Sequence, residues 1–395
     1  MKIRKAFKYR LKATEQQKQL FRQQAGCCRF VWNKFLWLQK QMLDSGDGLL
    51  SYVDMAKMLT AFKRIESNKF LYDVANHPLQ QSLMFLDRAF KAAFDKKNTK
   101  RFPRFKKKGY CIDSFRHPDR FKLNNDKIFL PKIGWIRFIK SREIEGKPKN
   151  VTVSRRDDHW YVSIQTEIEI ADPIHPSIST IGIDLGIARF ATLSDGSYLE
   201  PLNSFKKLES KLAKEQRKLS RKVEFSSNWK KQKRKVTELY VRIADARKDY
   251  LHKASTMISK NHAVVVLEDL KIKNMSASAT GSIDKPGKNV KAKSGLNKAI
   301  LDQGWAEFRR QLEYKQLWRG GEVISVPPHH TSQTCLECGH ISADNRKSQS
   351  SFVCANCGYS ENADFVGAIN ILRAGHARIA CEVNGAVMPS AAGTC

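Results

Sequence analysis

Three carboxylates in the second half of the chain have the residue type and setting that metal-dependent chemistry needs. Asp184 and Glu268 each end a short apolar run, and Asp364 opens a third apolar segment. Carboxylates brought together repel one another unless cations join them. Two Mg²⁺ ions about 4 Å apart satisfy such a set and drive in-line phosphodiester hydrolysis. The pattern predicts a nuclease site.

Each acid also has an ordinary structural explanation. Asp184 could be a turn residue, Glu268 could cap a helix with Asp269 beside it as a competing candidate, and Asp364 could be a helix N-cap. Their setting favours the site, because two of them end apolar strands, where α/β sheets present ligands. The third opens a helix that could pack beside such a sheet.

Four cysteines lie between the second and third acids. They form two C-x₂-C pairs separated by fifteen residues: Cys335, Cys338, Cys354 and Cys357. Four thiolates at this spacing make a closed tetrahedral Zn²⁺ site, which is structural rather than catalytic. The alternative is four unrelated buried cysteines. The other five cysteines show no pairing pattern, and we expect them to be reduced.

The charge of the chain predicts a polyanionic partner. Its 395 residues hold 71 Lys and Arg against 39 Asp and Glu, a net charge of +32. Phosphate neutralisation would relieve that self-repulsion, whereas surface solubility is the ordinary alternative. The sequence shows no membrane-spanning apolar run and no apolar signal segment at Met1, so we expect a cytoplasmic protein.

The apolar patterns predict the order of the elements. Residues 1–12 alternate like a strand, 14–94 follow helical spacing, and 110–170 read as short strands of a small barrel or a meander. An α/β pattern begins at Ser179 and ends in a helix over 363–372, followed by a loose tail. The Ser/Gly/Lys-rich residues 275–297 are either a plain loop or a lid.

Two basic segments are candidate nucleic-acid contacts. Residues 96–108 hold eight cations with two Phe between them, and 205–253 read as two helices with 17 Lys and Arg against six acids. A solvated linker and a solvated helix face are the alternatives; aromatics among cations favour stacking and backbone contact. The candidates are Lys100, Arg101, Arg104, Lys106, Lys107, Arg217, Arg221 and Lys222.

Five motifs occur in an order that resembles the TnpB family, the transposon-encoded relatives of type V CRISPR nucleases. They are Gly182-Ile-Asp184-Leu-Gly, Leu267-Glu268-Asp-Leu, Gly304-Trp305-x-x-Phe308-x-x-Gln311-Leu-x-Tyr314-Lys315, Thr331-Ser-Gln-x-Cys335-x-x-Cys338-Gly and Asn362-Ala-Asp364. The resemblance covers nearly the whole chain. Weaker motifs extend it to the N-terminal half: Phe30-Val-Trp-Asn33, Leu79-Gln80-x-Ser82-Leu83 and Phe102-Pro-Arg-Phe105-Lys.

The resemblance implies a multidomain α+β architecture. The expected parts are a split β-barrel (1–13 and 103–175), a helical insert (14–102), an RNase H-like α/β RuvC domain (179–326 and 360–376), a zinc ribbon (327–359) and a flexible tail (377–395). The RuvC domain would use Asp184, Glu268 and Asp364 with Mg²⁺. Gln80 matches a family position on the helix that faces the target-adjacent motif.

The implied activity is RNA-guided cutting of double-stranded DNA beside a short transposon-associated motif, by a monomer that carries one guide RNA from the transposon end. A nuclease-inactive guided repressor and a transposase are the alternatives. One departure concerns Val366, which stands where the family usually has Asn. We expect it to remove a polar group near the acids and to affect the rate.

Overall fold

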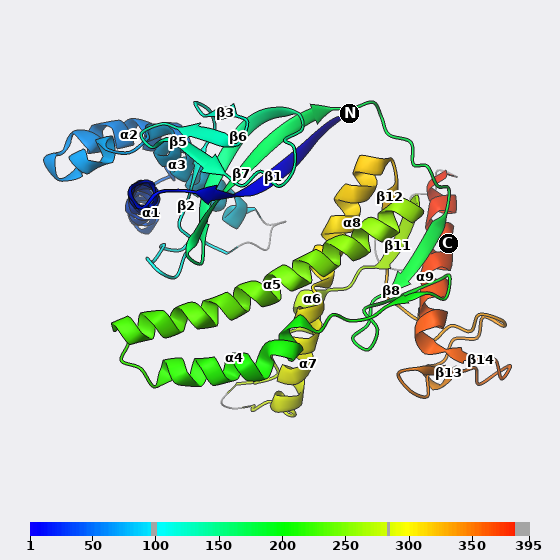
Figure 1. Cartoon of the computed structure of the whole chain (residues 1–395). Coiled ribbons are helices and arrows are strands. Elements are labelled where there is room, and N and C mark those ends of the chain that lie inside the picture. Colours follow the sequence, from blue (N-terminus) through cyan, green and yellow to red (C-terminus); the bar gives the residue numbers. More distant parts are fainter. Residues whose placement is uncertain (96–100, 283–284, 384–395) are drawn as a thin grey trace. The chain divides into compact units, whose positions relative to one another are not determined.

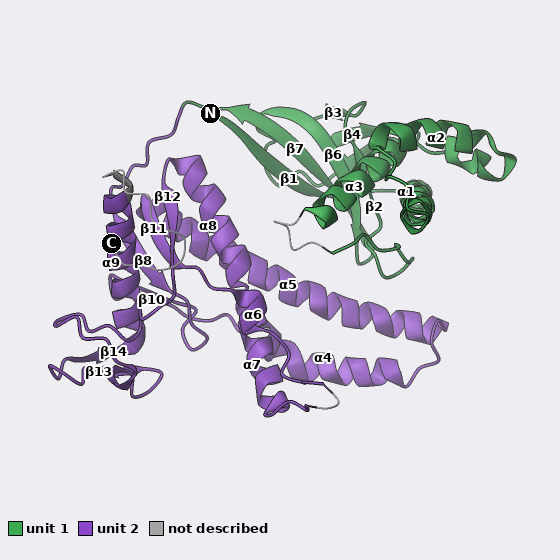
Figure 2. Ribbon diagram, turned by 180° about the vertical axis from the view of Figure 1, so that it is seen from behind, with its two compact units in different colours: residues 1–171 green, residues 172–395 purple. Residues whose placement is uncertain are grey.

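The computed structural model describes residues 1–95, 101–282 and 285–383. They form two compact units, Met1–Ala171 and Asp172–Cys395, which Figure 2 colours separately. No helix among the described residues is long and apolar enough to cross a membrane.

The first unit is built on a seven-stranded antiparallel sheet in the order β2-β6-β7-β1-β5-β4-β3. Its strands are β1 (Lys2–Lys12), β2 (Ser114–His117), β3 (Lys122–Asn124), β4 (Lys127–Leu130), β5 (Gly134–Phe138), β6 (Lys147–Arg156) and β7 (His159–Glu169). The predicted alternation of β1 is confirmed, since its apolar residues are buried and its cations exposed. The strand order has two ends, at β2 and β3, so the predicted barrel is an open sheet within the described residues.

Two helices pack on this sheet as the 3.6-residue spacing predicts, α1 (Glu15–Asp44) and α3 (Asn76–Phe94). The helix α2 (Tyr52–Arg64) packs against α3, and the 3₁₀ segment η1 (Glu66–Tyr72) packs against α2. Thr14 makes the predicted capping box with Gln17 at the start of α1. Phe21 of α1 lies between Phe115 and Trp160 of the sheet, with a ring separation of 5.0 Å to Trp160.

The second unit holds a five-stranded mixed sheet in the order β10-β9-β8-β11-β12. The strands are β8 (Thr180–Asp184), β9 (Ala191–Leu193), β10 (Tyr198–Leu199), β11 (Val264–Glu268) and β12 (Glu322–Val326). The three strands β8, β11 and β12 run parallel, while β9 and β10 are antiparallel. The parallel strands are nearly continuous apolar runs because helices cover both faces of the sheet.

The helices of this unit are α4 (Ser204–Ser220), α5 (Ser227–Asn261), α6 (Ile272–Met275), α7 (Val290–Gln303), α8 (Trp305–Arg319) and α9 (Ala363–Val383). The predicted pair of basic helices over 205–253 is confirmed as α4 and α5. Figure 1 shows the sheet between α8 on one side and α9 on the other. The small ribbon of β13 (Ser351–Val353) and β14 (Ser360–Asn362) precedes α9, with the 3₁₀ turn η2 (Ala343–Asn345) before it.

Two boundaries differ from the prediction. The final helix continues to Val383 rather than ending at Leu372, because Gly375 allows a close approach to Val266 of β11 and Ile379 packs against the same apolar cluster. The predicted tail at 377–383 is therefore helical, and 384–395 lie outside the described residues. The segment 275–297 is only partly a loop, since α6 and α7 occupy its ends.

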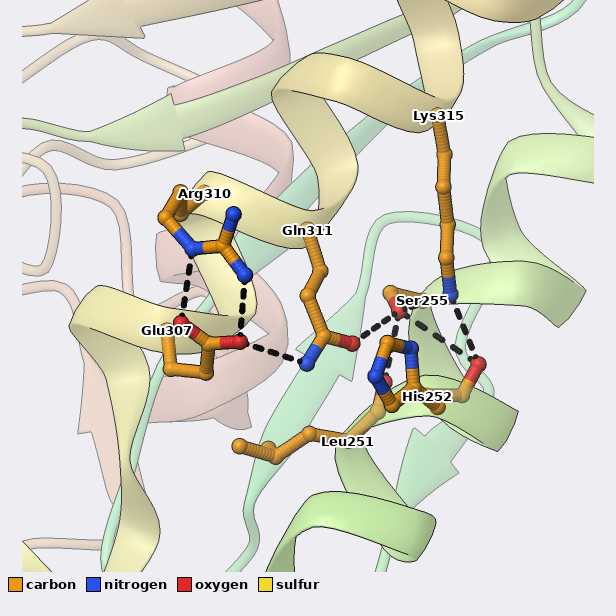
Figure 3. Close-up of polar contacts among 7 residues, drawn as sticks. All are labelled: Leu251, His252, Ser255, Glu307, Arg310, Gln311 and Lys315. Atoms are coloured by element: carbon orange, nitrogen blue, oxygen red, sulfur yellow. Dashed lines mark hydrogen bonds and ion pairs between the residues drawn. The ribbon is translucent and has the colours of Figure 1, made fainter. Parts of the chain in front are cut away.

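A polar seam joins α5 to α8 and explains the Gly304–Lys315 motif (Figure 3). Gln311 accepts from Ser255 Oγ at 2.9 Å and donates to Glu307 at 3.0 Å. Lys315 donates to Ser255 Oγ at 2.7 Å and to two further oxygens of α5. Burial lowers the pKa of Lys315 to about 8. Paired polar groups inside an apolar contact fix the register of two helices, so this motif holds α8 on α5.

Close contact between α9 and the sheet depends on Gly182 of β8. A Cβ at Gly182 would lie 2.3 Å from Ala368 O and 2.7 Å from Leu372 N, both backbone atoms of α9. Only a glycine allows this approach. The Gly-x-Asp pattern therefore sets the position of the helix that carries Asp364.

We expect Gly182→Ala to destabilise the second unit by about 1–3 kcal/mol, because the added methyl group must push α9 away from the sheet. Gly295→Ala is the matched control: nothing lies within 4 Å of its Cβ position in α7, so it should be neutral or gain up to about 1 kcal/mol. Urea unfolding of both variants measures this. Equal stabilities for the two variants would show that α9 does not depend on the glycine.

Candidate functional site

The sheet and α9 bring the three predicted acids to one edge. Leu267 pairs in parallel with Ile183, so Asp184 and Glu268 follow at neighbouring strand ends. Asp364 stands in the first turn of α9. One turn later, a Cβ at Gly367 would lie 3.1 Å from Asp184 Oδ2, which shows how closely α9 passes this carboxylate.

The electrostatics of Asp184 reflect a concentration of negative charge. Its pKa is raised to about 7, first by burial and then by the charges of Glu268 and Asp364. Burial also raises the pKa of Glu268. A buried set of carboxylates that repel one another is suited to hold divalent cations, which would remove the repulsion.

Arg346 is a charged neighbour of the acids that sequence reasoning missed. Its guanidinium lies 3.7 Å from Asp364 Oδ1. Its positive charge opposes the rise in the pKa of both Asp184 and Glu268. It comes from the segment between the two cysteine pairs. Nothing in its local sequence signals this role, because only the folded ribbon carries it to the acids.

Thr331 fixes the second acid. Its hydroxyl donates a 2.6 Å hydrogen bond to Glu268 Oε1, which opposes the effect of burial on the pKa of Glu268. The amide of Asn370, which is buried on α9, donates in turn to the carbonyls of Thr331 and Thr334, each at 2.8 Å. A continuous chain of contacts therefore runs from α9 through the start of the ribbon to Glu268.

We expect Thr331→Val to slow DNA cleavage about 10- to 100-fold, because Glu268 loses the donor that orients it. Thr331→Ser keeps the hydroxyl and should retain most of the activity. The measurement is single-turnover cleavage over a series of Mg²⁺ concentrations, together with the melting temperature. The interpretation would be wrong if Thr331→Val and Thr331→Ser cleaved DNA at the same rate. It would also be wrong if a lower melting temperature alone explained the loss of activity.

The structure also separates the acids from their structural alternatives. Asp269 Oδ1 lies 2.7 Å from Arg309 Nη1, and this contact lowers the pKa of Asp269. Asp269 therefore belongs to a surface ion pair. The N-terminus of α9 is capped by Asn362, whose side chain accepts from the amides of Asp364 and Phe365. The carboxylate of Asp364 is not needed as the cap.

Among the described residues, one group of His, Cys, Asp and Glu side chains is compact enough to share an ion, and it is the predicted set of four cysteines. The carboxylate oxygens of Asp184, Glu268 and Asp364 do not form such a compact group. Their chemistry and mutual repulsion fit hard cations, which take oxygen ligands in a flexible arrangement.

The four cysteines meet as a metal site requires. Their Sγ atoms lie within 4.8 Å of one another, with 3.6 Å between Cys335 and Cys357 and between Cys338 and Cys354. Gly339 and Gly358, which follow the two C-x₂-C pairs, take positive φ angles of 70° and 76°. The thiols of this cluster shift in opposite directions: the backbone amide of His340 is the first cause that lowers the pKa of Cys338 to about 6, whereas, against the backbone amide of Tyr359, the neighbouring thiols raise the pKa of Cys357 to about 12.

Val366 is fully buried in the apolar cluster that it forms with Cys335, Phe352, Cys354 and Ala363. An apolar residue suits this place, since a polar group buried there would need a partner. Thr331 and Arg346 make the polar contacts of Glu268 and Asp364. The effect of Val366 on the rate stays a prediction.

The candidate nucleic-acid residues are placed in different settings. Gln80 is half-exposed on α3, and Lys106 is half-buried. The exposed residues are Arg101, Arg104, Lys107, Arg217, Arg221 and Lys222. The last three lie at the end of α4 and the turn that follows it. Lys100 lies outside the described residues, and contact of these cations with nucleic acid stays a prediction.

Comparison with known proteins adds independent information. Residues 163–279 match the OrfB_IS605 family, described as "Probable transposase", residues 305–371 match a Cas12f1-like TNB domain, and residues 1–47 match a helix-turn-helix domain. In this chain residues 1–47 hold β1 and α1. The fold resembles that of a Cas12f1 protein solved with its RNA and target DNA, with a TM-score of 0.54, 17% identity, and coverage of 91% of this chain and 83% of that one.

Two curated relatives match along nearly the whole length. One, from Escherichia coli K12, is named "Putative RNA-guided DNA endonuclease InsQ"; it is 54% identical over 96% of this chain and 94% of its own. The other, from Streptomyces pristinaespiralis, is named "Putative RNA-guided DNA endonuclease"; it is 34% identical over 96% of this chain and 91% of its own. The resemblance carried by the five motifs is thereby confirmed, and the chain belongs to the TnpB/IS605 OrfB family.

Proposed function

We propose that this protein is an RNA-guided DNA endonuclease of a transposable element. The observation that carries the proposal is the set of three acids at one edge of the mixed sheet, where burial and mutual repulsion raise the pKa of Asp184 to about 7. The strand order β10-β9-β8-β11-β12 agrees with an RNase H-like RuvC domain. The relatives' names and the net charge of +32 support a nucleic-acid substrate.

Asp184, Glu268 and Asp364 would hold Mg²⁺, as the pair of ions that a carboxylate set of this kind accommodates. The bound ions would supply an activated water and stabilise the charge that develops on the scissile phosphate. Thr331 orients Glu268, and Gly367 leaves room for the Asp184 carboxylate beside α9. Arg346, beside Asp364, places a positive charge where a phosphate would approach.

The four cysteines would hold one structural Zn²⁺. Four thiolates complete the tetrahedral shell, so no position remains for chemistry. The ribbon nevertheless contributes to the acid site, because Arg346 lies within it and Thr331 stands just before its first cysteine. Bracing by zinc and cutting by magnesium are thus separate tasks in adjacent parts of one unit.

The partners in this proposal are a guide RNA from the transposon end and double-stranded target DNA beside a short motif. One copy of the protein would carry one RNA, in the cytoplasm and on the nucleoid. Gln80 on α3 and the exposed cations of α4 remain candidate contacts.

The experiment that tests the function uses the purified protein with its copurifying RNA, a matching DNA duplex and Mg²⁺. We expect cut DNA. Binding without cutting in Mg²⁺ or Mn²⁺ would favour a guided repressor, although all three acids are present here. Joining of transposon ends without RNA would favour a transposase.

A further inference from the structure

A cavity of about 130 Å³ in the first unit is lined by cationic side chains from three segments of the chain. Arg29 comes from α1, Lys106 from the segment before β2, and Arg116 from β2 itself. No Asp or Glu is among the residues that line it. Uncharged donors, including Gln81 and Ser82 of α3, complete the wall.

The described residues provide little to balance these charges. Arg29 is paired with Asp113 at 2.7 Å, whereas Lys106 and Arg116 make no ion pair within the described parts of the chain. Lys106 Nζ lies 3.7 Å from the centre of the Trp32 ring, and Arg116 Nε is buried without a hydrogen-bond partner. Burial lowers the pKa of both side chains.

The neighbouring thiol does not serve as the counter-charge. Cys28 also lines the cavity, but burial raises its pKa to about 11, so it is neutral near pH 7. Partial burial of cations without anionic partners costs free energy, and a structure that needed only packing would do better with apolar side chains there. An anion with several acceptor oxygens would balance these charges.

We propose that this cavity binds a phosphate group of the nucleic acid that the protein carries, held between Lys106 and Arg116. A phosphate offers the acceptor oxygens that a guanidinium and an ammonium bind most strongly. The aromatic rings of Phe85 and Phe115 in the same wall suit the sugar or base attached to it. The proposal rests on the proposed function, because it assumes a nucleic-acid partner.

The test compares Arg116→Gln and Lys106→Gln with Lys69→Gln in the full-length protein. Lys69 forms an exposed ion pair with Glu66, so its loss removes the same charge at little cost to stability. Affinity for the copurifying RNA and for target duplex is measured at several salt concentrations, and melting temperatures are measured in sodium phosphate and in sodium chloride at equal ionic strength.

We expect each cavity variant to bind nucleic acid about 10-fold more weakly, with the salt slope reduced by about one, while the control changes little. The free variants should melt at or above the wild-type temperature, because a buried unpaired cation is removed. Phosphate should raise the melting temperature of the wild-type protein and not that of Arg116→Gln.

A loss with RNA alone assigns the phosphate to the guide, and a loss with duplex alone assigns it to the target. Variants that bind both nucleic acids like the control would overturn the proposal, as would a fall in melting temperature that accounts for the weaker binding. If the wild-type protein binds no RNA, the proposed function itself fails, which is a different result.

Discussion

Asp184→Asn should lower DNA cleavage at least about 10³-fold and, in the same protein, raise the melting temperature measured in EDTA. The loss of activity follows because the substitution removes a proposed Mg²⁺ ligand, and the bound ions would supply several kcal/mol of transition-state stabilisation. The gain in stability follows because Asp184 is buried and is held near two other carboxylates, which together raise its pKa to about 7. The expected gain at neutral pH is on the order of 3 kcal/mol.

The gain should depend on pH in a defined direction. A carboxyl with a raised folded-state pKa takes up protons on folding, so its cost is absent near pH 4, grows towards pH 7 and is level above it. The difference in melting temperature between variant and wild type should therefore be larger at pH 8 than at pH 5, and smaller when Mg²⁺ is present. Asp269→Asn, which alters a surface ion pair, is the control and should still cut DNA.

Two outcomes would contradict this account of Asp184. Cleavage at the wild-type rate by Asp184→Asn would remove it from the catalytic set. A lower melting temperature in EDTA at pH 8 would mean that the carboxylate stabilises the fold and is not strained by its neighbours. RNA and DNA affinities of the variant should stay near wild type, which separates a chemical defect from a binding defect.

Cys354→Ser should remove the bound zinc and lower the stability of the second unit, rather than abolish the chemical step alone. Structural zinc contributes about 10–16 kcal/mol to the folding of isolated zinc fingers, so the ribbon should unfold locally without it. Cys354 shares its apolar cluster with Val366 and Ala363 of α9, and Arg346 and Thr331 would lose their places beside the acids. Activity and stability should fall together.

The measurement pairs zinc content with thermal unfolding and cleavage. Cys111→Ser, a cysteine outside the cluster, should keep its zinc and its melting temperature. An unchanged melting temperature in a zinc-free Cys354→Ser protein would contradict the structural role. Strong chelators should reproduce the effect of the substitution in the wild-type protein.

The sequence predicts those parts of the site that local patterns control. Apolar runs that end in an acid identify Asp184 and Glu268, because a buried strand and its C-terminal end are both local features. The cysteine spacing identifies the ribbon for the same reason. The two basic helices and the capping box at Thr14 also follow from spacing within one segment.

Contacts between distant segments explain what the sequence could not predict. Thr331 and Glu268 are 63 residues apart, and their hydrogen bond exists only after the ribbon returns to the sheet. The burial of Val366 among Cys335, Phe352 and Cys354 likewise exists only after the ribbon folds against α9. The charged cavity of the first unit likewise requires three separate elements to meet.

A guide exchange tests the central claim most directly. The protein is loaded with one of two RNAs that differ only in the guide segment and is given both matching DNA duplexes in Mg²⁺. The account predicts that cleavage follows the RNA, switching targets when the guide is switched, and disappears with Asp184→Asn. Cleavage at the same site with either RNA, or undiminished cleavage by the variant, would contradict it.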